Sequence, residues 1–137
     1  MSVHTNIRAA ARQLVLDTAG LPAAKFWEGE RFSTTLGVPY LQEQVSAISD
    51  VVRAVGPGGN IAHTIAVRLT LGFPAGKGTL AVESAADLLM AAFRPGGSLA
   101  YGADSGVIQQ CERSSLRQEP DWISCTVTAT VVAYTSN

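Results

Sequence analysis

The stretch His63-Thr-Ile-Ala-Val-Arg-Leu-Thr-Leu71 is the clearest strand in the sequence. After His63, every second residue is a branched apolar one, and the positions between them include Thr64, Arg68 and Thr70. Because successive side chains of a strand point to opposite faces of a sheet, this pattern predicts one buried face and one polar face.

The C-terminal stretch, residues 122–134, repeats this pattern. Ile123, Val127 and Val131 fall on one side with other apolar residues, whereas Thr126 and Thr128 lie on the opposite side. β-Branched polar residues suit the exposed face of a sheet. Weaker strand patterns follow the same rule in residues 25–28, 40–47, 50–55 and 107–113.

Two stretches have helical periodicity. Residues 5–18 end at Gly20 and Pro22, and residues 79–93 end at Pro95-Gly96-Gly97. Ala81, Ala85, Leu88, Leu89 and Ala92 form the expected apolar stripe of the second helix. We therefore expect Leu88 to be buried, and an aspartate there to prevent folding.

The order of elements predicts an α+β protein. Alternating strands joined by short turns favour a mainly antiparallel sheet, with both helices packed on one face. The 137 residues fit a single domain, 1–137. Residues 56–60 and 98–106 are rich in small or turn-forming residues, so we expect mobile loops there that become ordered on a partner.

The charge content is low for a protein that stays alone in solution. Charged residues make up 15% of the chain and the net charge is −1, against about 25% charged residues in average soluble proteins. We infer that part of the surface is covered by a partner or by other copies of the chain. The near-neutral charge disfavours nucleic-acid binding, and we expect no membrane span and no secretion signal.

No group of residues predicts a catalytic, cofactor or metal site. His63 has no Asp, Glu or Cys close in sequence, which favours a structural histidine. Cys111 and Cys125 are too few for a metal cluster, and we expect free thiols. Glu28 and Glu43, with Glu30, are typical of a solvated or inter-subunit charge set rather than of paired catalytic carboxylates.

Two short motifs imitate known sites. Gly72-Phe-Pro-Ala-Gly-Lys-Gly78 is one residue short of a phosphate-binding P-loop, and its Pro74 donates no amide. Asp104-Ser105-Gly106 matches the triplet of aspartic proteases, but it follows a poor strand. We interpret the first as a turn before the helix and the second as a hairpin tip.

The order of the segments is more specific than either motif. It comprises a helix ending at Leu21-Pro22, then Phe26-Trp-Glu28, Phe32, Gly37-Val-Pro-Tyr-Leu41, a strand entering Pro74-Ala-Gly-Lys-Gly78, a helix ending Phe93-Arg-Pro95, and a final strand led by Trp122. Over nearly the whole chain this order resembles the tail terminator, or tail completion, proteins of long-tailed bacteriophages.

The resemblance implies a structural virion protein, not an enzyme. It would be made in the host cytoplasm and form a six-membered ring, a homo-oligomer that caps the head-proximal end of the tail tube. Its partners would be the tail tube protein and the head–tail connector, with no cofactor. Glu43 interrupts the apolar side of residues 40–47, which indicates an edge strand or one that faces a partner. We expect Glu28, Glu43 and Arg68 at the subunit or tube interface.

Other functions remain open at this stage. One is another ring protein of the phage neck or tail, either a head-closure connector or a tube subunit. A second is a small ligand-binding domain or enzyme that uses a cleft between residues 79–93 and the sheet. A convergent set of perturbed titratable groups would favour the enzyme.

Overall fold

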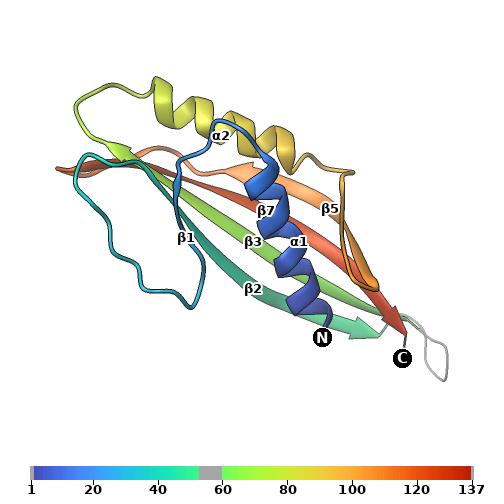
Figure 1. Ribbon diagram of the computed structural model, residues 1–137. Coiled ribbons are helices and arrows are strands. Elements are labelled where there is room, and N and C mark those ends of the chain that lie inside the picture. The colour runs from blue at the N-terminus through green and yellow to red at the C-terminus, as the bar shows by residue number, and fades with distance from the viewer. Residues whose placement is uncertain (1, 53–59, 137) are drawn as a thin grey trace.

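The structure, a computed structural model, describes residues 2–52 and 60–136. These residues form two helices packed on one face of a seven-stranded sheet (Figure 1). The elements are α1 (Val3–Asp17), β1 (Ala24–Phe26), β2 (Tyr40–Val52), β3 (Asn60–Pro74), α2 (Leu80–Ala92), β4 (Ser98–Tyr101), β5 (Asp104–Arg113), β6 (Arg117–Gln118) and β7 (Trp122–Ser136). The predicted α+β class is confirmed.

The sheet is built around its two longest strands, β3 and β7. They pair in antiparallel register from Pro74 opposite Trp122 to Asn60 opposite Ser136. The strand order is β1-β2-β3-β7-β5-β4, and β6 adds to the start of β7. Only the short β1–β2 pair is parallel among the described strands. The predicted alternation places the apolar side chains of β3 and β7 under the helices, where they form the core.

Helix α1 begins two residues earlier than predicted because Ser2 caps it. The Ser2 side chain accepts a hydrogen bond from the Thr5 backbone N–H at 3.2 Å, which satisfies one of the unpaired donors of the first turn. The helix then buries Val3, Ile7 and Val15 against the sheet. This stripe packs mainly on β3, β4 and β5, whereas Arg8 and Arg12 on another side of α1 reach Glu43 of β2.

Helix α2 is rotated relative to the predicted stripe. Leu89 and Phe93 are fully buried, and Val82 lies one turn or more before them on the same side. Leu88 is 39% exposed, so the expectation that it is buried was wrong. Its Cδ1 lies close to Gly20, in the segment that follows α1.

Three predicted segments have different outcomes, and of these only residues 98–106 differ from the prediction. Residues 40–47 and 50–55 belong, as far as they are described, to the continuous strand β2, which has a bulge between Ala47 and Ser49. Residues 98–106 form the β4–β5 hairpin instead of a mobile loop, with Gly102 at φ +61° in its turn. Of the predicted loop 56–60, all but Asn60 lies outside the described residues.

Strand β2 is an edge strand over most of its length. Among the described strands, β1 covers its outer side only at Tyr40–Gln42. From Glu43 onward the described part of β2 pairs with β3 alone, which agrees with one of the two interpretations of this segment. No helix among the described residues is long and apolar enough to cross a membrane.

Candidate functional site

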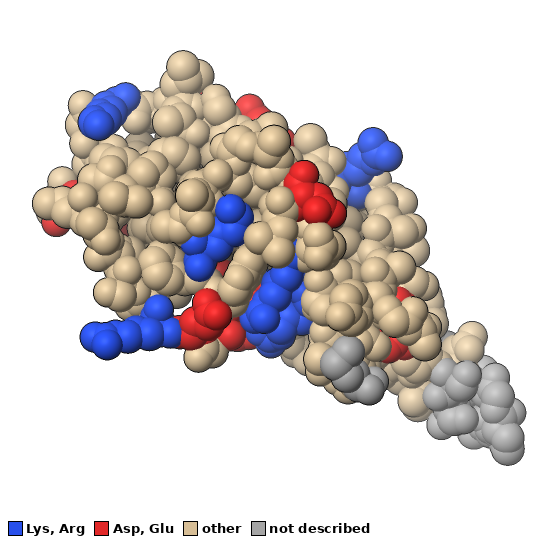
Figure 2. Space-filling view, viewed as in Figure 1, with Lys and Arg blue, Asp and Glu red and all other residues tan. Residues whose placement is uncertain are grey.

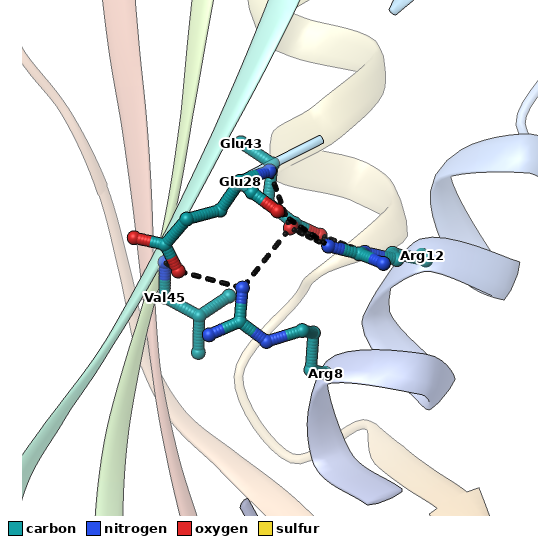
Figure 3. Close-up of polar contacts among 5 residues, drawn as sticks. All are labelled: Arg8, Arg12, Glu28, Glu43 and Val45. Carbon is teal, nitrogen blue, oxygen red and sulfur yellow. Dashed lines mark hydrogen bonds and ion pairs between the residues drawn. The ribbon is translucent and has the colours of Figure 1, made fainter. Parts of the chain in front are cut away.

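Four charged side chains meet between α1 and the edge strand β2 (Figure 3). Arg8 and Arg12 lie one turn apart on α1, Glu43 is on the inward face of β2, and Glu28 follows β1. Glu43 faces inward because it lies two positions after the buried Leu41, on the same side of β2. We call these four residues the ion-pair cluster.

Arg12 and Glu43 form the centre of the ion-pair cluster. The Arg12 Nε donates to Glu43 Oε2 at 2.9 Å, and its Nη2 donates to Glu43 Oε1 at 2.7 Å. This two-bond geometry is the strongest that a guanidinium and a carboxylate form. The Glu43 side chain is 1% exposed, so the pair replaces the water that this carboxylate loses on folding.

Glu28 extends the ion-pair cluster to the surface and to the sheet edge. The Arg8 Nη1 donates to Glu28 Oε1 at 2.6 Å, and the Val45 backbone N–H donates to the same oxygen at 3.3 Å. The Glu28 backbone N–H in turn donates to Glu43 Oε1 at 3.2 Å. Glu28 therefore accepts from a backbone donor that the unpaired edge of β2 would otherwise leave to solvent.

The ion-pair cluster shifts the pKa values of two of its members. The hydrogen bond from Arg8 lowers the pKa of Glu28, against an opposing effect of burial. The hydrogen bond with Glu43 raises the pKa of Arg12. In both cases the folded protein favours the charged form, so the cluster stabilises the fold while its members are ionised.

Acid is expected to weaken the fold partly through Glu28. Since its pKa is lowered from about 4.5 in the folded state, its contribution is present above about pH 4.5 and disappears as the pH falls through the lower folded value. The side chain is 35% exposed, so the contribution is about 1 kcal/mol or less. Urea unfolding between about pH 3 and pH 7 should show a shallower acid limb for Glu28→Gln than for the control Glu119→Gln. Equal acid limbs would contradict this role.

A small pocket adjoins the ion-pair cluster. It holds about 180 Å³ and is lined in part by Trp27, Glu28 and Glu43. Pockets for metabolites usually hold about 300 Å³ or more. The Arg12 guanidinium lies 5.4 Å from the centre of the Trp27 ring, which lines this pocket. The charges of the cluster pair with one another and thereby connect α1 to β2.

The face of the sheet opposite the helices is polar and carries little charge. Across it, one row places Gln44, Arg68, Thr128 and Glu112 next to one another on β2, β3, β7 and β5. Along these four strands Arg68 and Glu112 are the charged residues that the register places on this face. In the described part of the chain Arg68 makes no ion pair, and it is exposed. We call this surface the open face.

The three predicted interface residues do not lie together. Glu28 and Glu43 belong to the ion-pair cluster on the helix side, and Arg68 is on the open face. Glu43 is almost completely buried and already paired within its own chain. Its position on the apolar side of the strand was visible in the sequence, but its partners, Arg8 and Arg12, depend on how α1 packs.

A second polar cluster was missed in the sequence. His4, Asp50 and His63 bring ligand atoms to within 4.8 Å of one another. Asp50 is thirteen positions from His63 in sequence but directly opposite it in the β2–β3 register. The signal in the sequence was the turn predicted at residues 56–59, since a turn there would pair the two strands.

The model of one protein family matches almost the whole chain. A model of the family "phage tail terminator protein" covers residues 6–130. The chain belongs to the phage tail terminator family. It is therefore a structural protein of the phage tail and a component of the virion. Its assembly with other virion proteins follows from the same membership.

Solved structures share the fold of this tail terminator family member at low identity. A chain in the virion of a native gene transfer agent particle is 14% identical, with a TM-score of 0.65, covering 99% of this chain and 98% of that one. A solved protein without a functional name is 15% identical, with a TM-score of 0.58 and coverages of 93% and 92%. None of the curated proteins matches the chain.

Proposed function

We propose that the protein forms a ring that caps the head-proximal end of the phage tail tube. The ring ends tube polymerisation and joins the tail to the head connector. A cyclic ring needs a heterologous interface, in which one patch of a subunit meets a different patch of its neighbour. The membership in the tail terminator family and the distribution of apolar surface support this proposal.

Apolar side chains are exposed at both ends of the long strands. Leu36, just before β2, is 72% exposed, and Leu80, the first residue of α2, is 77% exposed. Near the end of β2, Ile48, Val52 and Tyr134 are each more than half exposed. These two different patches at opposite ends of β2 are what a heterologous contact requires, and this observation carries the proposal.

The amount and character of the surface agree with coverage by neighbours. The chain exposes 7509 Å², against about 6,800 Å² for a typical monomer of this mass. On the helix side, charged atoms gather mainly beside α1 and broad areas carry no charge (Figure 2). The open face is also nearly uncharged, so both sides suit contacts with other virion proteins.

Mass measurement and imaging test the ring directly. The chain should sediment as a closed oligomer, or form one on isolated tail tubes, and negative-stain images should show a ring at one tube end. A strict monomer without affinity for tube ends would contradict the proposal. Growth of the chain into long tubes would instead identify a tube subunit.

Arg68 is the predicted interface residue that can be tested without disturbing the fold. We propose that the open face around Arg68 contacts the neighbouring subunit or the tube. Arg68→Glu should change the free energy of unfolding by less than about 0.5 kcal/mol, because the residue is exposed, yet reduce ring or tube-end binding at least about tenfold. Arg94→Glu, exposed after α2 on the helix side, is the matched control. Equal binding by both variants would place the interface elsewhere.

Glu28 and Glu43 have an indirect part in this proposal. Glu43 is too buried to touch a partner, but it holds Arg8, Arg12 and the backbone of Glu28 in place. Glu28 is the member with a partly exposed carboxylate. A partner at the edge of β2 would therefore meet Glu28, supported by the three residues behind it.

A further inference from the structure

A second set of polar side chains lies where α1 begins, beside the end of β2 and the start of β3. Asp50 Oδ1 is 2.6 Å from His63 Nδ1 and 3.4 Å from His4 Nε2. The other ring nitrogen of His63 is 2.7 Å from Thr135 Oγ1 on β7. Four elements that are distant in sequence thus converge on one carboxylate and two imidazoles.

We propose that His4, Asp50 and His63 form a binding site for a divalent transition-metal ion of the Zn²⁺ type. Two imidazoles and one carboxylate are a common ligand set for zinc in sites that keep a fourth position for water. Bonds of about 2.0–2.1 Å in tetrahedral geometry place donor atoms about 3.4 Å apart. The His4–Asp50 separation already has this value, and all three donors lie within 4.8 Å of one another.

The His4 imidazole is oriented for a metal rather than for a hydrogen bond. Its Nε2 is shielded from solvent and makes no hydrogen bond within the described residues, although Asp50 Oδ1 is 3.4 Å away. A buried polar atom without a partner is costly, so such an atom calls for an explanation. An ion between the two donors gives Nε2 a partner and keeps the observed separation.

Thr135 supplies the outer support that metal-bound histidines usually have. With the imidazole proton on Nε2, His63 donates to Thr135 Oγ1 and presents the lone pair of Nδ1 to the ion. The contact between His63 Nδ1 and Asp50 then opens by about 0.8 Å to bridge a metal. The Asp50 side chain is 50% exposed, so it is free to make this movement and leaves the ion a path from solvent.

The same atoms also have the order of a hydrolase triad. Asp50, His63 and Thr135 follow one another as carboxylate, imidazole and hydroxyl. A hydrolase also aims N–H donors at the oxyanion beside the hydroxyl. Here the fourth group is the imidazole of His4, and it approaches Asp50 and not the Thr135 hydroxyl. A second imidazole beside the carboxylate favours a metal site over a nucleophile.

The test uses the chain without a histidine tag, because its sequence holds only two histidines. Co²⁺ titration of the native chain should produce the visible absorption bands of a low-symmetry site, and Zn²⁺ should displace Co²⁺ and raise Tm. His4→Gln should lower the Co²⁺ affinity by at least about 100-fold, since it removes one of three ligands and loss of a residue that merely supports a ligand already costs about 10–100-fold. His4 is at the surface end of α1, so the variant should keep the native circular dichroism spectrum.

Two controls make the result decisive. Asp87→Asn removes an exposed carboxylate that pairs with Arg113 on α2 and β5, and it should bind Co²⁺ as the native chain does. Asp50→Asn should lose affinity as His4→Gln does. The proposal is overturned if the native chain shows no bands, if His4→Gln binds normally, or if a near-ultraviolet thiolate band places the ion at Cys111 or Cys125 instead.

Discussion

Replacing Leu89 with aspartate is expected to leave no folded protein under native conditions. Leu89 is fully buried between α2 and the sheet, in the same cluster as Val82 and Phe93. An unpaired carboxylate there costs several kcal/mol in its charged form, and the lost apolar contacts add about 2–5 kcal/mol. Since a domain of this size is stable by only about 5–15 kcal/mol, the sum approaches its whole stability. Soluble yield and far-ultraviolet circular dichroism measure the outcome.

Leu88→Asp is the matched control, one position away on the same helix. Leu88 is 39% exposed, so its aspartate reaches water, and we expect a loss of about 1 kcal/mol or less. The helical periodicity of the sequence predicts, instead, that aspartate at Leu88 prevents folding. If both variants unfold to the same extent, the helix is rotated differently from the structure.

The rotation of α2 was hard to predict because small apolar residues occur on several sides of this helix. Ala81, Ala91 and Ala92 accompany the leucines, so several stripes fit the periodicity almost equally well. Phe93 decides between them in the structure, because it is the largest fully buried side chain and lies four positions after Leu89. A pattern of apolar positions treats alanine and phenylalanine alike, so it does not show that the largest side chain decides which face of the helix is buried.

Strands were predicted wherever apolar and polar residues alternate, even weakly, but residues 98–106 were predicted as a loop. β3 and β7 follow from branched apolar residues at every second position. Residues 98–106, which form β4 and the start of β5, are mostly small or polar, and Leu99 is their residue in the hydrophobic core. Contacts between α1 and these strands, including Asn6 to Asp104 at 2.7 Å, supply what local propensity lacks.

The sequence alone predicts neither polar cluster, and the reason is the same for both. Glu43 was recognised as a carboxylate on an apolar side, and His63 as a histidine on a similar face. Their partners come from α1 and from the neighbouring strand, at separations set by register and helix packing. A buried charge in a strand pattern therefore indicates a partner without saying whether that partner belongs to the same chain.

Glu43→Gln is expected to destabilise the protein by about 3 kcal/mol. The amide keeps the shape of the side chain but removes the charge that faces Arg12 and Arg8 in a site with 1% exposure. Breaking a buried ion pair from one side costs about 3–5 kcal/mol, and the lower end applies because both arginines keep about 30% exposure. Urea unfolding at neutral pH measures the loss. Glu30→Gln, an exposed carboxylate of the same segment, should change stability by less than about 0.5 kcal/mol.

A double-mutant cycle separates the ion pair from simple packing. Arg12→Met keeps the stem of the side chain, and the double variant with Glu43→Gln should be clearly more stable than the sum of the two single losses predicts. The reason is that each single change leaves an unpaired polar group in the cluster, whereas the double change removes the mismatch. Strictly additive losses would mean that Arg12 and Glu43 act independently, and that their pairing does not hold α1 against β2.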